Sequence, residues 1–295
     1  MQYYHVDYQK LKTFCEKVFQ GYGFSEEESG QITDVLLLAD VYGIQSHGTQ
    51  RLVRYHKDIA KGLIQVDAKP ETVFETPVSA VIDAHDGMGQ VVAHKAMSLA
   101  IKKAKEYGMG MVVVRNSCHY GIAGYYTSMA TKAGCIGMTG TNARPSVAPT
   151  LGVEGMFGTN PFTLGVPTDE DFDFNFDCAT SITQNGKVEY YERIGEEIHP
   201  GTVIDLDGNP VEGDAGVALK KIRQGTAALT TLGGIGEALG GYKGYGFALF
   251  VEFLSSILQD GAYGKDLDGK DAEGNIRPYQ LGHFFIAIDT DHFLG

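Results

Sequence analysis

The chain has 295 residues and a formal net charge of −13 at pH 7, with 24 Lys and Arg against 37 Asp and Glu. Because nucleic-acid binding requires clustered cations that neutralise phosphates, this composition argues against a nucleic-acid partner. No apolar run approaches the roughly 20 residues of a membrane span, and no basic-then-apolar leader precedes the first helical pattern. We therefore expect neither a membrane partner nor export.

The four cysteines occupy positions 15, 118, 135 and 178, with no CxxC spacing and no dense disulfide pattern. Such sparse spacing is typical of reduced thiols in a cytoplasmic protein, and it argues against a zinc site. We therefore expect a cytoplasmic protein without a bound metal.

The N-terminal region up to residue 62 is predicted to be helical, because apolar residues recur there at helical spacing. The two apolar stripes are Leu11, Phe14, Cys15, Val18 and Phe19, and then Ile32, Leu36, Leu37 and Val41. Ser25 and Glu28 predict a capping box at the start of the second helix, and Gly43 is expected to end it.

A third helix is predicted to follow, with Ser46 as its cap. Along this helix His47, Arg51 and Tyr55 recur every four residues, which would place their polar tips nearly in line. Leu52, Ile59 and Leu63 are expected to supply the buried side.

Strand and helix signals alternate after these helices. Strands are predicted at 71–83 with a break near Pro77, and at 111–115, 136–140, 162–166, 172–176 and 283–288; helices are predicted at 89–108, 122–132 and 245–261. The stretch 183–242 is polar and glycine-rich, with a turn at 207–210, and is expected to be a surface excursion. The pattern predicts a mixed α/β fold.

Common nucleotide and hydrolase motifs are missing. GGIGEALGG at 233–241 has the wrong spacing for a Rossmann fingerprint and follows no clear strand, so a flexible glycine loop is the preferred interpretation. Neither GxxxxGK[ST] nor GxSxG occurs, which excludes a P-loop and a hydrolase elbow.

A single histidine occupies a strand-to-helix turn in RNSCHYGIAGYY, residues 115–126. His119 could act as an acid or base there, because imidazole titrates near neutral pH, although a loop histidine can equally be structural. Cys118 cannot pair with His119, since neighbouring side chains on an extended backbone point in opposite directions. We expect Cys118 to be a packed neighbour.

Three other segments could complete a site. Arg51, one helical turn from His47, could clamp a carboxylate with two hydrogen bonds; the alternative is a solvated helix face. TNARPSVAP at 141–149 and FGTNPF at 157–162 could present backbone groups to a ligand, or could be ordinary loops. DCATS at 177–181 and GGYKGYG at 240–246 bring Lys243 to a helix start, where it could contact phosphate or lie on a surface turn.

Together and in this order, six motifs resemble the family of type 2 malate/lactate dehydrogenases, which includes ureidoglycolate dehydrogenase and 2,3-diketogulonate reductase. The motifs are SHGxxR, NSxHxGxAGYY, TNxxPxVAP, FGTNPF, DxATS and GGYKGYG, and the resemblance runs to about Phe293. It implies a non-Rossmann mixed α/β fold, dependence on NAD or NADP, a small carboxylate substrate and a homodimer. It also implies a helical N-terminal region for substrate and dimer contacts (1–118, joined by 262–295) and a cofactor-binding domain (119–261).

The resemblance also assigns residues. His119 matches the family's proton acceptor and His47 a proton donor of the diketogulonate branch, so the identity of the base stays open. Arg51 matches the residue that holds the substrate carboxylate. Cofactor-lining positions match Ala143, Asp177, Cys178, Ala179 and Lys243. Oxidation of a 2-hydroxy acid needs a base for the hydroxyl proton and a carboxylate clamp, which these residues provide.

Several alternatives stay open. The substrate could be malate, lactate, ureidoglycolate, a cyclic imine or a diketo sugar acid, and the cofactor could be NAD or NADP. Family members usually continue past the position of Phe293 with a Pro-Gly segment at the cofactor, so the chain is either truncated or compensated elsewhere. A catalytically impaired binding homologue is the alternative from a different class.

Overall fold

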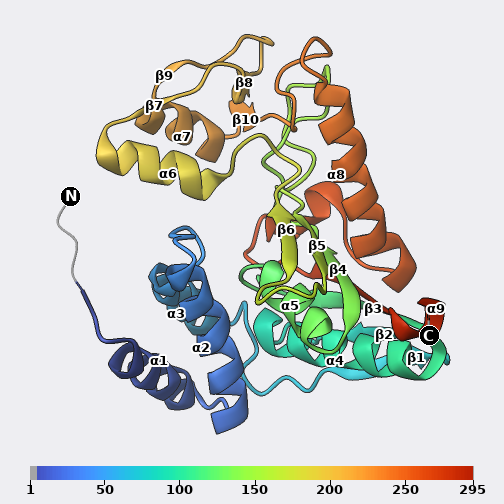
Figure 1. Cartoon of the computed structure of the whole chain (residues 1–295). Coiled ribbons are helices and arrows are strands. Elements are labelled where there is room, and N and C mark those ends of the chain that lie inside the picture. The colour runs from blue at the N-terminus through green and yellow to red at the C-terminus, as the bar shows by residue number, and fades with distance from the viewer. Residues whose placement is uncertain (1–4, 295) are drawn as a thin grey trace.

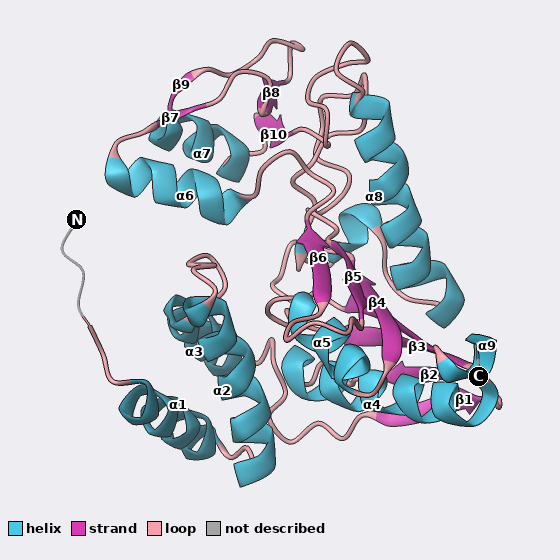
Figure 2. Ribbon diagram, viewed as in Figure 1, coloured by secondary structure: helices cyan, strands magenta, loops and turns pink. Residues whose placement is uncertain are grey.

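The computed structural model describes residues 5–294, and its centre is a seven-stranded sheet (Figures 1 and 2). Its strands, in spatial order, are β1 (Glu71–Glu75), β2 (Ser79–Asp83), β3 (Met109–Ser117), β11 (Leu281–Asp289), β4 (Cys135–Thr141), β5 (Phe162–Val166) and β6 (Phe174–Cys178). β2 and β3 pair in parallel, and the other neighbours pair antiparallel. The predicted mixed α/β fold is confirmed.

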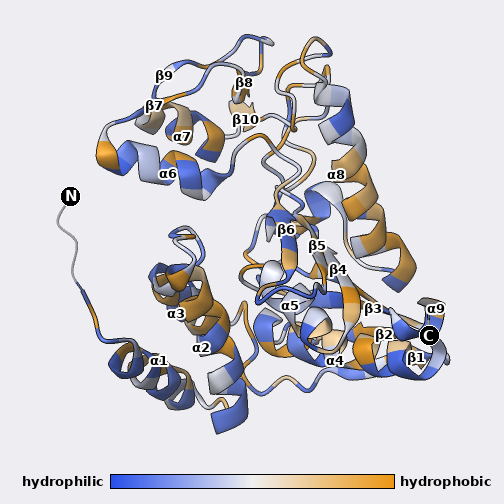
Figure 3. Cartoon of the chain, in the orientation of Figure 1, coloured by the Kyte–Doolittle hydropathy of each residue, from blue (hydrophilic) through white to orange (hydrophobic). Residues whose placement is uncertain are grey.

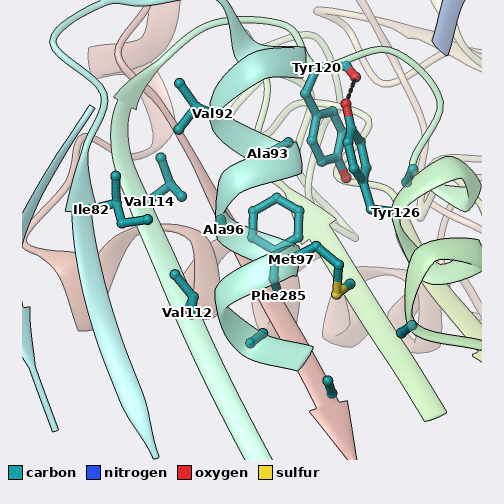
Figure 4. Close-up of a cluster of buried hydrophobic side chains, with 14 of the residues drawn as sticks. Ile82, Val92, Ala93, Ala96, Met97, Val112, Val114, Tyr120, Tyr126 and Phe285 are labelled. Atoms are coloured by element: carbon teal, nitrogen blue, oxygen red, sulfur yellow. Dashed lines mark hydrogen bonds between the residues drawn. The ribbon is translucent and has the colours of Figure 1, made fainter. Parts of the chain in front are cut away.

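Helices cover both faces of this sheet, because the side chains of β3 alternate between the two faces. The covering helices are α4 (Gly89–Tyr107), α5 (Gly124–Lys132) and α8 (Gly241–Ser256). Val112 and Val114 pack in the core under α4, together with Phe285 of β11 (Figure 4). Val113 faces the other way and packs against Val251 of α8. The strand therefore fixes both layers at once.

The N-terminal helices form a layer beside the sheet. They are α1 (Tyr8–Tyr22), α2 (Glu26–Val41), the 3-10 turn η1 (Thr49–Arg51) and α3 (Leu52–Ala60). The predicted capping box is present, with Ser25 and Glu28 each accepting the other's backbone N–H. Cys15 and Phe19 are buried as predicted, but Phe14 is 56% exposed because α1 packs mainly on α2 and buries a narrow line of side chains. Val41, at the end of α2, is exposed too.

The prediction that Ser46 caps a third helix is wrong. Residues 45–48 form a turn, and the first helical residue is Thr49. The Asp40 carboxylate accepts the Thr49 N–H at 2.9 Å, and it lies where a Cβ on Gly48 would be. A side chain of the preceding helix therefore takes the capping role, and the turn folds back onto α2.

The prediction that 183–242 is a surface excursion is also wrong. The segment forms α6 (Asn185–Ile194), β7 (Glu197–Ile198), β8 (Val203–Asp205), β9 (Gly213–Asp214), α7 (Ala215–Arg223) and β10 (Ala227–Leu229). Val188, Val203 and Leu219 are almost fully buried in a hydrophobic core of their own. We call residues 185–229 the upper lobe (Figure 2). Its elements are too short for their apolar residues to show a period in the sequence.

The central sheet joins both sides of the predicted domain boundary. β3 ends at Ser117, just before that boundary, and β11 pairs with β3 on one side and β4 on the other. The division at residue 118 stays a prediction. The remaining elements are η2 (Ile257–Gln259), η3 (Gly264–Asp268) and α9 (Asp291–Leu294). Among the helices of residues 5–294, none is long and apolar enough to cross a bilayer.

A buried histidine in the middle of the sheet should make stability depend on pH. His283 of β11 is 0% exposed and stacks on Tyr120, with 4.6 Å between the ring centroids. Its Nδ1 lies 2.6 Å from Thr141 Oγ1. Burial lowers the pKa of His283 to about 3 from the ordinary 6.5.

Between these two pKa values the unfolded chain binds a proton that the native protein does not, so the free energy of unfolding should fall as the pH drops through this window. From pH 7 to pH 5, His283 should account for a loss of up to about 2 kcal/mol. Urea unfolding of the wild type and His283→Asn at both pH values measures this loss. An equal pH dependence in the two proteins would contradict the prediction.

Candidate active site

Two imidazoles from distant parts of the chain meet between the N-terminal helices and the end of β3. His47 lies in the turn before η1, and His119 follows β3 by two residues. Their rings stack with centroids 5.3 Å apart and planes at 25°. The fold therefore brings together the two histidines that the sequence nominated for acid–base chemistry.

The backbone around His119 is anchored on both sides, which directs its ring away from the core. Cys118 and Tyr120 are 3% and 2% exposed, whereas His119 between them is only half-buried. A Cβ on Gly89 would lie 2.5 Å from the carbonyl oxygens of Cys118 and His119, so the start of α4 presses directly on this backbone. Burial raises the pKa of Cys118 to about 12, which suits a packed thiol and not a nucleophile.

A buried tyrosine holds one nitrogen of His119. Tyr55 Oη lies 2.8 Å from His119 Nδ1, and Gln90 Nε2 donates to the same Oη at 2.7 Å. Tyr55 and Gln90 are 1% and 0% exposed, so water does not compete for these bonds. The predicted straight line of His47, Arg51 and Tyr55 on one helix does not form, because His47 precedes the helix, yet His47 and Tyr55 both reach His119.

A second amide and hydroxyl hold His47. Ser46 Oγ lies 2.7 Å from His47 Nδ1, and Gln184 Nε2 donates to Ser46 Oγ at 3.2 Å. Gln184 is the residue before α6, so this contact joins the upper lobe to the N-terminal helices. Arg193 of α6 adds a 3.4 Å hydrogen bond to Gln50. The site is therefore built from three separate parts of the fold.

Two arginines make the site cationic. Arg51 Nε donates to the Ser46 carbonyl, and its Nη2 lies 3.3 Å from the point where Gly186 would carry a Cβ. Arg54 pairs with Asp58 at 3.4 Å. Burial first, and then Arg51 and Arg54, lower the pKa of His47 to about 3.

The same causes act on His119. Burial first, and then the nearby charges, hold its pKa well below the ordinary value; these charges are Arg54, His47, Arg51 and His283. Both imidazoles are therefore neutral near pH 7. A neutral imidazole can accept a proton, and it does not repel a cationic clamp.

A cavity of about 530 Å³ opens beside Gln184. Its lining includes Cys178, Ala179, Ser181, Gln184, Lys187 and His199. Cys178 and Ala179 are two of the predicted cofactor residues. Asp177, predicted with them, uses both carboxylate oxygens inside the protein: it accepts the Gly124 N–H at 2.7 Å and the Thr163 hydroxyl at 2.9 Å. Its side chain thus holds the start of α5 to the sheet.

The other two predicted cofactor residues lie outside the lining of this cavity. Ala143 follows β4 and is packed against Gly158, where a Cβ would come within 2.3 Å of it. Lys243 lies exposed in the first turn of α8, with Nζ 5.8 Å from the ring centroid of Tyr242. Within residues 5–294 no group of three or more His, Cys, Asp or Glu could hold a metal.

The sequence did not single out Gln90, Gln184 or Lys187. An isolated glutamine carries no motif, and its role depends on which hydroxyl the fold places beside it. Lys187 belongs to the segment that was expected to be a surface excursion. In the structure it lines the cavity, and its Nζ lies 5.0 Å from the ring centroid of Tyr191. The amphipathic spacing of residues 186–193, GKVEYYER, is the signal that could have indicated a helix at this position.

Comparison with known proteins supports one family. The malate/L-lactate dehydrogenase family matches residues 6–295. The chain is 43% identical to a malate dehydrogenase of Pyrococcus horikoshii over 99% of this chain and 78% of that protein. It is 37% identical to an L-sulfolactate dehydrogenase of Methanocaldococcus jannaschii over 94% of this chain and 76% of that protein.

A solved structure agrees. The malate dehydrogenase of Entamoeba histolytica superposes with a TM-score of 0.95 at 42% identity, covering 100% of this chain and 81% of that one. The match in sequence and in structure extends over the sheet, the upper lobe and the N-terminal helices alike. The chain therefore belongs to the malate/L-lactate dehydrogenase family.

Proposed function

We propose that this dehydrogenase is NAD(P)-dependent and moves a hydride between nicotinamide and a malate-like 2-hydroxy acid. The observation that carries the proposal is the stacked pair of neutral imidazoles, His47 and His119, between two arginines. A neutral imidazole takes the proton of the C2 hydroxyl, and Arg51 holds the C1 carboxylate. Loss of that proton and of a hydride from C2 turns the 2-hydroxy acid into a 2-oxo acid.

The cavity beside Gln184 fits a cofactor of this kind. Its volume of about 530 Å³ lies in the range of small-molecule sites, and Cys178 and Ala179 form part of its wall. Lys187 adds a cation that suits a phosphate or ribose, and Ala143 and Lys243 would contact more distant parts of the molecule. When bound, nicotinamide supplies the hydride acceptor. Gln184 bridges the cavity wall to Ser46, which places the imidazoles next to it.

The two guanidinium groups favour a substrate with two negative charges. Arg51 and Arg54 lie one helical turn apart and both act on the imidazoles, whereas Asp58 supplies a single carboxylate. The surplus cation would bind a second anionic group such as the C4 carboxylate of malate. The relatives named malate and sulfolactate dehydrogenases support this choice, because both names imply a doubly charged acid.

A homodimer is part of the proposal. α8 exposes Phe247, Phe250 and Phe253, Ile257 of η2 adds to them, and Figure 3 shows the lower turns of α8 as strongly hydrophobic. A second copy would remove such a surface from water.

The other family activities, namely ureidoglycolate oxidation and reduction of imines or diketo acids, are the rival reactions, and a binding homologue without turnover is the rival class.

Turnover with a substrate panel tests the function. Absorbance of reduced cofactor should change with malate and either NAD or NADP, and more slowly with lactate. Ureidoglycolate, a cyclic imine acid and sulfolactate complete the panel. A folded protein that binds NAD(P)H but turns over none of these compounds would support the binding homologue instead.

Replacement of Arg51 by Lys should lower kcat/KM for malate by about 10- to 100-fold, because an ammonium loses one charge-assisted hydrogen bond of a two-pronged grip. Cofactor affinity should change less than about two-fold. Steady-state kinetics and NADH fluorescence measure the two effects. Arg223→Lys, an exposed residue at the end of α7 that pairs with Glu189, is the matched control. Unchanged kinetics in Arg51→Lys would contradict the assignment of Arg51 as the group that holds the carboxylate.

Replacement of Arg54 by Gln should affect malate more than lactate, because only malate carries a second carboxylate. We expect the malate-to-lactate ratio of kcat/KM to fall by about 10-fold, as for one exposed charge-assisted contact. Asp58→Asn, which releases the partner of Arg54, should not lower this ratio. A parallel loss for both substrates in Arg54→Gln would assign Arg54 to packing alone.

A further inference from the structure

We propose that Tyr55, Gln90 and the backbone of Gly121 hold His119 as the tautomer protonated at Nε2, so that His119 donates a hydrogen bond to the ligand while His47 takes the proton. Tyr55 and Gln90 are then positioning residues. The tautomer follows from contacts within the protein alone. The division of roles between the two histidines rests on the proposed function.

The backbone supplies the decisive contact. The Gly121 N–H points at His119 Nδ1 at 3.4 Å, and a backbone N–H can only donate. Gly121 has φ +84°, and a Cβ there would lie 2.3 Å from Val35 Cγ1. The turn is therefore locked against α2, and this donor cannot rotate away. Nδ1 must carry a lone pair.

Tyr55 strengthens the same assignment. The Gln90 amide donates to Tyr55 Oη, and because Gly121 already requires a lone pair on Nδ1, the Tyr55 hydroxyl 2.8 Å from Nδ1 acts there as a donor. Tyr55 and Gln90 are buried and His119 is half-buried, so the bond between the amide and the hydroxyl has little competition from water. Gly121 acts as a donor whichever way the Gln90 amide and the Tyr55 hydroxyl are turned, so the assignment of Nδ1 as an acceptor rests on the backbone contact and the tyrosine adds to it.

The consequence concerns Nε2, the other ring nitrogen. A neutral imidazole carries one proton, which the two donors at Nδ1 leave to Nε2. His119 can then donate to a carbonyl, an alkoxide or a carboxylate, but it has no lone pair with which to take a hydroxyl proton. Double protonation would put an Nδ1–H against the Gly121 N–H. The nearby arginines further disfavour double protonation of His119. The titratable groups that face His119 are Arg51, Arg54, His47, His283 and Tyr55.

His47 is held differently. Its hydrogen-bond partner among the described residues is the Ser46 hydroxyl, which can donate or accept by rotating. Gln184, the residue before α6, donates to that hydroxyl, and among the described residues no backbone N–H contacts the His47 ring. His47 can therefore present a bare Nε2 to the C2 hydroxyl and move its other proton toward Ser46. Of the two stacked rings, His47 is the one free to act as base.

Nitrogen NMR of the ¹⁵N-histidine-labelled protein tests the tautomer without any substrate. Long-range ¹H–¹⁵N correlations distinguish a ring protonated at Nε2 from one protonated at Nδ1, and spectra of His119→Gln and His47→Gln assign the signals. At pH 7 the full chain should show His119 protonated at Nε2. Protonation at Nδ1 would overturn the proposal, whether or not the protein has dehydrogenase activity.

Two variants test the positioning residues. Tyr55→Phe removes one donor to Nδ1, so the pKa of His119 should rise. Gln90→Glu reverses the direction of the chain, because its carboxylate accepts the tyrosine proton, and the pKa should rise further, by at least about one unit. A packing role alone would leave the pKa unchanged in both variants. If either variant fails to fold, the wild-type spectrum still decides the tautomer.

Gln31→Glu is the matched control, because Gln31 lies 3.3 Å from Nδ1 of another histidine, His94. The same chemical change should shift the His94 signal and leave His119 where it was. A shift of His119 in this variant would mean that added negative charge, and not the Tyr55 contact, moves the resonance.

Kinetics test the division of roles. His119→Gln keeps an N–H donor near the position of Nε2, so kcat with malate should fall less than about 10-fold and the pH profile should keep its shape. His47→Gln removes the base and should lower kcat by about 10²- to 10⁴-fold. The reverse order of the two losses would make His119 the base and refute the role given to His47. Absence of turnover in the wild type would refute the proposed function and leave the NMR result standing.

Discussion

The contact between Tyr55 and His119 is the interaction on which the site depends. It ties the N-terminal helices to the end of β3, alongside the stacked ring of His47 and the apolar packing around Cys118. The contact exists because Cys118 and Tyr120 are pulled into the core on either side, which leaves His119 to face the helices. A change that loosened either anchor would move the imidazole, the hydroxyl and the cationic turn at Arg51 relative to one another.

The local charge of the site is opposite in sign to the net charge of the molecule. The chain carries a net charge of −13, yet two arginines lie beside two imidazoles that burial keeps neutral. Anionic surfaces repel an acid substrate at long range, and salt screens that repulsion beyond about 10 Å. In the proposed function, selectivity for an acid would therefore arise over short distances inside the site, beside Arg51 and Arg54.

The sequence predicted the elements that have a clear period and missed those that do not. α4 spans 19 residues with regular apolar positions, and β3 reads as a run of valines, so both were placed correctly. The upper lobe was not predicted, because its strands have only two or three residues each. Motif order nominated His47 and His119, and the fold brings their rings together. Gln90 and Gln184 could not be found, because hydrogen-bond partners far apart in sequence are set by tertiary packing.

The position of β11 has a consequence for how the protein forms. This strand comes last among the eleven, but it occupies the middle of the sheet and pairs on both edges. Until residues 281–289 leave the ribosome, β3 and β4 each present an open edge with unpaired backbone groups. The sheet must therefore close late and through contacts distant in sequence, a topology that slows folding and exposes the nascent chain to aggregation.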